Sequence, residues 1–310
     1  LVDYLYASPA PSVKPENRVA LVYATGPIVG RSGDRGPLGE REIIGADETA
    51  KAIEDASKAA NVKVIVIRLD SPGGSATASE TIHRAIKQAR ANGKYVIVSM
   101  GGTAASGGYW IASAADYVLA SPSTLTGSIG VVAGKMVIGP LSDKLGITWS
   151  TLTTGTNSGM MAPDQPFTGS ALERVNASLD EIYNAFTARV MEGRKLTAEQ
   201  VDKLARGRVW AGAHAKELGL VDELGGLREA LLVARKHMGI EPDTPIQLAP
   251  FPEPESTEQQ MLKLIQQFII SPQLSPLTWS DVSQMIAATL RIPGTQPAST
   301  LYYTGPQPLD

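Results

Sequence analysis

One serine stands in a run of small residues that follows an apolar segment. Ser106 lies within residues 101–108, which are mostly Gly and Ala and come directly after the apolar segment 95–100. Small neighbours allow a substrate backbone to approach the hydroxyl, and the helix expected to start here would direct N–H groups toward developing negative charge. This pattern favours a nucleophile for acyl transfer. A turn that only packs against a neighbouring helix is the alternative interpretation.

A second glycine-rich turn comes earlier in the chain. Asp70-Ser71-Pro72-Gly73-Gly74-Ser75 closes the β-branched segment 62–69, whose composition predicts a parallel strand buried on both faces. Glycines leave the backbone N–H groups unobstructed by Cβ atoms, so two such amides could hold an oxyanion. By itself, however, a Pro-Gly-Gly sequence is more often only a turn.

A third segment is crowded with hydroxyls. In residues 121–131, Thr126 and Ser128 flank a glycine ahead of an apolar stretch. One of these two side chains could point toward the site and form a hydrogen bond with a catalytic amine. The other interpretation is a Ser/Thr-rich loop whose hydroxyls bond to their own backbone.

Together, the three segments resemble the signal peptide peptidase (SppA, or protease IV) family, whose fold is shared with Clp proteases and crotonases. The resemblance covers about residues 19–235 and includes the later segments 207–210 and 215–222. It implies an α/β fold of repeated βαβ units with a largely parallel sheet. It also implies that Ser106 is the nucleophile, that Gly74 and Gly107 form the oxyanion hole, and that Ser128 orients a lysine base.

The lysine itself is missing from the expected place. Family members with one catalytic unit per chain carry it where this chain has Ser158, 30 residues after Ser128. In longer members with two tandem halves, a lysine of the first half serves the serine of the second, and this chain resembles that second half. The resemblance therefore implies that an upstream homologous half supplies the base. Lys135, Lys94 and Lys144 are weaker local candidates.

The sequence gives little support for a histidine base, a cysteine nucleophile or a bound cofactor. The three histidines, His83, His214 and His237, lie in helical patterns and are expected to pack or face solvent rather than form a triad. The chain has no cysteine, which excludes disulfides, thiolate metal sites and a cysteine nucleophile. No cofactor and no metal site is predicted.

Net charge and hydropathy limit the kinds of partner that are expected. The net charge is −3, so the composition shows no excess of positive charge of the kind that binds nucleic acid. The apolar run 261–270 is interrupted by polar residues and is shorter than the roughly 20 residues that a membrane-spanning helix needs. The family resemblance instead implies an upstream anchor in the bacterial inner membrane, with the catalytic portion facing the periplasm.

Strand and helix patterns alternate along the first half of the chain. Strands are expected at 18–23 and 62–69 and helices around 52–60 and 82–89, which predicts right-handed crossovers and a parallel sheet with Ser106 and Gly74 at its carboxyl ends. A long amphipathic helix and two shorter ones follow. We expect three parts: a connection from an upstream half (1–18), a Clp/crotonase-like peptidase domain (19–240), and a Pro-rich arm with a helical extension (241–310).

The predicted function is that of a serine endopeptidase with a Ser-Lys dyad. Its expected substrates are remnants of cleaved signal peptides and other membrane-associated peptides, and its expected state is a homo-oligomer such as a tetramer. Two alternatives stay open: a catalytically silent half that supports a partner, and a crotonase-like enzyme acting on acyl thioesters.

Overall fold

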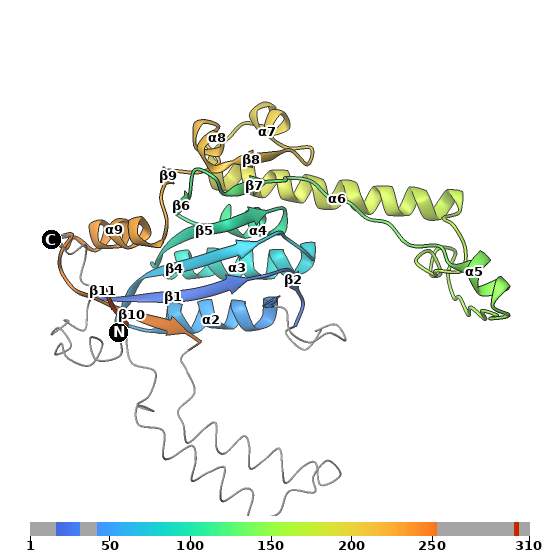
Figure 1. The fold of residues 1–310 in the computed structure, drawn as a ribbon, viewed down its shortest axis with the longest axis horizontal. Coiled ribbons are helices and arrows are strands. Elements are labelled where there is room, and N and C mark those ends of the chain that lie inside the picture. The colour runs from blue at the N-terminus through green and yellow to red at the C-terminus, as the bar shows by residue number, and fades with distance from the viewer. Residues whose placement is uncertain (1–16, 32–41, 253–300, 304–310) are drawn as a thin grey trace, which may run out of the picture.

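A largely parallel β-sheet forms the centre of the molecule. The computed structural model describes residues 17–31, 42–252 and 301–303. Within them, the main path of the sheet has the order β11-β10-β1-β4-β5-β6-β9, and β7 and β8 continue it beside the end of β5 (Figure 1). The strands of this sheet are β1 (Arg18–Thr25), β4 (Val62–Ser71), β5 (Tyr95–Ala105), β6 (Tyr117–Ala120), β7 (Leu125–Gly127), β8 (Val209–Ala211), β9 (Glu223–Leu224), β10 (Ile246–Phe251) and β11 (Leu301–Tyr303).

Helices cover both faces of this sheet, and a small second sheet pairs β2 (Ile28–Val29) with β3 (Ile44–Gly45). The strand-helix alternation confirms the predicted α/β class. The helices are α2 (Ala46–Lys58), α3 (Ala76–Ala91), α4 (Gly107–Ala112), α5 (Gly139–Lys144), α6 (Gly169–Arg194), α7 (Ala198–Leu204), α8 (Gly212–Glu217) and α9 (Leu227–Met238).

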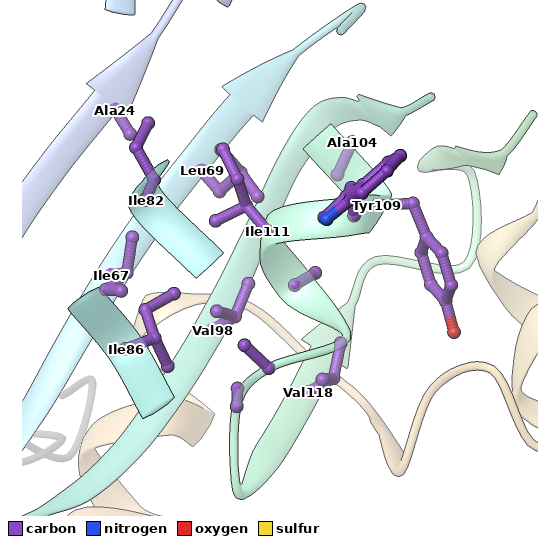
Figure 2. Packing of buried hydrophobic residues seen from close by; sticks show 14 of the residues in the cluster. Ala24, Ile67, Leu69, Ile82, Ile86, Val98, Ala104, Tyr109, Ile111 and Val118 are labelled. Atoms are coloured by element: carbon purple, nitrogen blue, oxygen red, sulfur yellow. The ribbon is translucent and has the colours of Figure 1, made fainter. Parts of the chain in front are cut away.

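Strand β4 shows why helices must cover both faces of the sheet. Ile65 and Ile67 belong to a core shared with α2 and α3, whereas Val64 and Val66 belong to a second core shared with α9. Successive side chains of a strand point to opposite faces, so a continuous β-branched run is buried on both. Figure 2 shows one of these faces, where Ile82 of α3 lies near the sheet residues of the first core.

Strand β5 is longer than the sequence predicted, because it continues through the glycine-rich run to Ala105. The carboxylate of Asp70 holds this end, accepting hydrogen bonds from the N–H groups of Gly102 (3.1 Å) and Thr103 (3.0 Å). At Gly101 a Cβ atom would lie only 2.4 Å from Asp70 Oδ2, so a larger residue does not fit. Asp70 thus aligns the strand that leads to Ser106.

Helix α6 extends well beyond the sheet. It has 26 residues and begins at Thr168, whose side chain accepts a hydrogen bond from the N–H of Ala171. The chain between β7 and α6 runs out along this helix, and α5 lies beyond its far end, away from the sheet (Figure 1). We call residues 131–168 the outer arm.

The Pro-rich composition predicted an irregular arm from residue 241, and this is wrong for residues 246–251. These residues form β10, which pairs in parallel with β1. Pro250 fits because proline tolerates extended backbone and the other neighbour of β10, β11, pairs with it only over 246–248. The two helices predicted within 262–290 lie outside the described residues, so the three-part division of the chain stays a prediction.

Candidate active site

Ser106 occupies a strained turn between β5 and α4. Its backbone has φ 52° and ψ −121°, a conformation that residues other than glycine rarely adopt. Two hydrogen bonds hold this turn: the N–H of Ser106 donates to the carbonyl of Gly127 (2.9 Å), and its carbonyl accepts from the N–H of Trp110 (2.9 Å). The hydroxyl makes no capping bond to the helix. It lies half-buried in a cleft of about 930 Å³.

The Pro-Gly-Gly turn meets Ser106 directly. A Cβ atom on Gly73 would lie 2.7 Å from Ser106 Cβ and 2.8 Å from the nitrogen of Gly107, so only glycine allows this approach. Likewise, a Cβ on Gly107 would lie 3.2 Å from the nitrogen of Gly74. Gly74, Ser106 and Gly107 all line the cleft. The structure therefore brings together the nucleophile candidate and the two amides expected to serve it.

The two candidates of the hydroxyl-rich segment, Thr126 and Ser128, lie in different surroundings. Thr126 is buried, and its hydroxyl donates to the carbonyl of Ala104 at 2.7 Å, so it supports β5 rather than the cleft. Ser128 has a φ of 49°, donates its N–H to the carbonyl of Arg208 at 2.7 Å, and lines the cleft. Of the two, Ser128 is the one that lines the same cleft as Ser106.

No lysine or histidine is among the described residues that line this cleft. Lys135 lies in the outer arm, where its ammonium donates to the carbonyls of Met160 (2.8 Å) and Ala162 (2.9 Å). Ser158, at the position where a lysine was expected, is exposed and bonds to the carbonyl of Gly155. Lys94 donates to carbonyls at the start of β4, and Lys144 is exposed in α5.

The histidines also lie elsewhere. His83 is buried in α3, and burial lowers its pKa from 6.5 to about 4 although Glu80 opposes the shift. His237 of α9 stacks on Tyr95 with ring centroids 3.8 Å apart. His214 belongs to α8 and, like the other two, is absent from the cleft lining.

The walls of the cleft include residues that the sequence did not single out. Helix α6 contributes Ile182, Tyr183 and Phe186 on one side. On the rim, the guanidinium of Arg206 pairs with the carboxylate of Asp202 at 2.7 Å. The apolar stripe of α6 predicted core packing, and its spacing alone carries no sign of a cleft. The family-like segment at 207–210 was the only nearby signal.

The described residues contain neither a metal-binding cluster nor a membrane-spanning helix. They contain no group of three or more His, Cys, Asp or Glu side chains placed to hold a metal ion. None of the helices in the described ranges is both long and apolar enough to cross a membrane.

Comparison with known proteins decides the family. The sequence profile of peptidase family S49 matches residues 88–241, and the Clp protease profile matches residues 46–125. A relative from Synechocystis sp. that is described as a protease is 33% identical over 218 residues, covering 69% of this chain and 78% of that protein. The chain belongs to peptidase family S49. The family fits the Clp/crotonase-like fold predicted from the sequence.

Other S49 relatives are longer than this chain. Protease 4 of Salmonella typhi is 41% identical over 239 residues, which are 75% of this chain and 36% of that protein. The chloroplastic serine protease SPPA of Arabidopsis thaliana is 32% identical over 256 residues, or 82% of this chain and 37% of that protein. The matched region of this chain thus spans little more than a third of either relative.

Proposed function

We propose that Ser106 is the nucleophile of a serine peptidase whose base is a lysine outside this chain. One observation carries the proposal: the Ser106 hydroxyl shares a cleft with Gly74 and Gly107. The cleft has no lysine or histidine among its described lining residues. A serine hydroxyl is a weak nucleophile until a base takes its proton, so a functioning site requires an amine from elsewhere.

Each residue then has a defined role in the reaction. Ser106 Oγ attacks the peptide carbonyl carbon while the lysine amine accepts the hydroxyl proton. The N–H groups of Gly74 and Gly107 stabilise the oxyanion, and losing one such donor typically costs about 3 to 4 kcal/mol. The ammonium then protonates the leaving amine, and water activated by the same base hydrolyses the acyl-enzyme. Ser128 holds the amine in line.

The lysine must be uncharged to act as a base. In water its pKa is about 10.4, and burial lowers the pKa of an amine because it disfavours the charged form. A second protein unit seated over the cleft would bury the amine as it delivers it. The proposed source is the homologous upstream half of the longer enzyme.

Substrates would be extended peptides. The cleft combines apolar walls with exposed residues at Gly74 and after Ser128. A peptide could therefore bind by adding a strand, with small or apolar side chains in the cleft. Remnants of signal peptides have this character. We propose that the enzyme is a homo-oligomer anchored upstream in the bacterial inner membrane, with this portion in the periplasm.

The test uses the full-length enzyme and a fluorogenic apolar peptide. We expect Ser106→Ala to lower kcat at least about 10³-fold and to abolish labelling by a fluorophosphonate probe, without lowering the thermal midpoint. Ser123→Ala, at an exposed serine of the hydroxyl-rich loop, is the matched control and should behave as wild type. Full activity in Ser106→Ala would remove Ser106 from the mechanism.

Both alternative functions give different results in the same assays. A silent half predicts no labelling of Ser106 even though the longer enzyme is active. A crotonase-like enzyme predicts thioester turnover that survives Ser106→Ala, because that chemistry needs the paired amides but not the hydroxyl. Membership of peptidase family S49 favours the peptidase.

A further inference from the structure

A buried indole beside the nucleophile is anchored by a carboxylate from another helix. Trp110 Nε1 donates to Glu80 Oε2 at 3.0 Å. The same carboxylate accepts two hydrogen bonds from Arg189 of α6, from Nε at 3.2 Å and from Nη2 at 2.8 Å. Glu80 therefore ties α4 to both α3 and α6.

Trp110 is part of the substrate cleft. It lies one helical turn after Ser106 and its side chain is 4% exposed. Trp110 lines both the active-site cleft and a neighbouring groove of about 530 Å³ that Glu80 and Arg189 also line. The orientation of the indole therefore contributes to the shape of the cleft.

Stacking alone would leave that orientation poorly defined. Trp110 stacks on Phe186 with ring centroids 4.7 Å apart and an interplanar angle of 25°. Aromatic pairs tolerate several offset arrangements, whereas a hydrogen bond from the indole N–H fixes one edge of the ring. An ionised acceptor makes that bond stronger than a neutral one would.

Glu80 is suited to this role because it stays ionised. Burial raises the pKa of Glu80, but hydrogen bonds from Arg189 and Trp110 outweigh this effect and the pKa is lowered. His83 lies behind it, with Nδ1 3.9 Å from Glu80 Oε2, and is neutral at pH 7 because burial lowers its pKa to about 4.

We propose that Glu80 is a positioning residue that sets substrate selection by fixing the indole of Trp110. The side chain of the substrate residue bound beside Ser106 would meet this wall, so a loosened indole should change which side-chain sizes fit. This inference rests on the proposed peptidase function of Ser106. It adds a residue that touches neither the substrate nor the reacting atoms.

The structure offers a matched control between the same helices. Lys87 of α3 forms an ion pair with Glu192 of α6, whereas the indole of Trp110 bonds to Glu80 and stacks on Phe186. Glu192→Ala therefore removes a link between α3 and α6 without releasing the indole. An effect seen for Glu80→Ala but not for Glu192→Ala cannot come from helix-helix linkage alone.

The experiment measures kcat and KM of the full-length enzyme on two peptides that differ only by Leu or Ala on the acyl side of the cleaved bond. Glu80→Ala should change the Leu/Ala ratio of kcat/KM at least about fivefold, mainly through KM, since side-chain discrimination in apolar pockets is typically about 10- to 200-fold. Glu80→Gln, which keeps an acceptor, should restore most of the ratio. Glu192→Ala should leave it unchanged.

A double-mutant cycle separates positioning from structure. Trp110→Phe keeps the ring but removes the N–H, so adding Glu80→Ala to it should change the ratio less than about twofold. If Glu80→Ala fails to fold, Glu80→Met, which has a similar length, takes its place in the cycle. An equal effect of Glu80→Ala in both backgrounds, or the same shift in Glu192→Ala, overturns the inference. Turnover that is independent of Ser106 overturns the proposed function as well.

Discussion

At Ser106 the backbone and the chemistry make opposite demands. With φ 52° and ψ −121°, this residue sits where glycine is favoured, yet the proposed reaction needs the serine side chain as nucleophile. Non-glycine residues in such regions cost of the order of 1 to 3 kcal/mol, which the surrounding hydrogen bonds must offset. In the proposed mechanism the strain has a use, because the sharp turn places Ser106 in the lining of the cleft.

Our first prediction separates strain from function. Ser106→Gly should relieve the strain and should be more stable than Ser106→Ala by about 1 kcal/mol, although both variants are inactive. Urea unfolding of the two proteins, compared at equal m-values, measures the difference. If Ser106→Gly is no more stable than Ser106→Ala, the turn is not strained in solution.

A second prediction concerns the contact between Gly73 and Ser106. Gly73→Ala would place a Cβ 2.7 Å from Ser106 Cβ at a φ of 105° and should abolish peptidase activity. Gly93→Ala is the matched control, because its φ is 82° but nothing lies within 4 Å of the added atom. We expect Gly93→Ala to cost about 1 kcal/mol of stability and to keep full activity in the peptide assay. Equal activity of the two variants would show that the contact is not needed.

The site residues were predictable from sequence to the extent that they sit in motifs. Ser106, Gly74, Gly107 and Ser128 were all named, and the structure places them around one cleft. Short-range sequence does not reveal whether a hydroxyl points inward, so the residues alone left Thr126 and Ser128 open and only the family resemblance selected Ser128. The role of Asp70 in holding β5 was missed because it depends on contacts 32 and 33 residues away.

At the scale of elements, period and β-branched density predicted most strands and helices of the α/β unit. Two differences have the same cause. The glycines of β5 and Pro250 of β10 have low strand propensity, yet β5 pairs with β4 and β7 and β10 pairs with β1, which makes both segments strands. Similarly, the apolar residues of α6 have the spacing of a helix face that packs on a core. Only the position of α6 beside Trp110 shows that part of this face forms a wall of the cleft.

Helix α3 carries a third prediction, on acid stability. The folded pKa of His83 is about 4, below its usual 6.5, because of burial, with Arg189 and Lys87 lowering it and Glu80 and Glu192 raising it. The unfolded chain therefore binds this proton first as the pH falls. Stability should be lost from about pH 6.5 down to about pH 4, with about 2 kcal/mol lost between pH 7 and pH 5.

The measurement is the free energy of unfolding as a function of pH. His83→Leu should flatten the curve between pH 6.5 and 4 relative to wild type, whereas His214→Leu, outside the core, should not. Glu80 also loses a stabilising charge in acid, but it does so in all three proteins, so the comparison isolates His83. An unchanged slope in His83→Leu would mean that the pKa of this histidine is not lowered in the native state.

At the scale of the whole molecule, the outer arm holds most of the large apolar side chains that are exposed in the described residues. Thirteen large apolar side chains are exposed among the described residues, and nine of them lie in this arm. Soluble proteins seldom leave such a concentration uncovered. The nine residues are Val132, Met136, Val137, Leu141, Leu145, Ile147, Trp149, Leu152 and Met161.

The position of the arm relates this exposed apolar surface to the proposed lysine base, because the arm begins at the cleft. Its first residues, Val131 and Val132, still line the cleft, so a partner seated on the arm would stand next to Ser106. We expect the occupant to be the homologous unit that delivers the lysine. The family resemblance implied such a unit but did not indicate where it docks.

The fourth prediction tests this docking in the full-length enzyme. Replacing Leu145, Trp149 and Leu152 by serine should reduce both the assembled fraction in sedimentation velocity and the rate of fluorophosphonate labelling. These side chains are 65%, 46% and 97% exposed and lie outside both hydrophobic cores, so the thermal midpoint of this domain should not fall. Tyr23→Ser, at an exposed aromatic residue on β1, is the control and should change neither readout. Wild-type assembly with slow labelling would instead mean that the arm orients the base without holding the partner, whereas wild-type values for both would show that the lysine arrives by another surface.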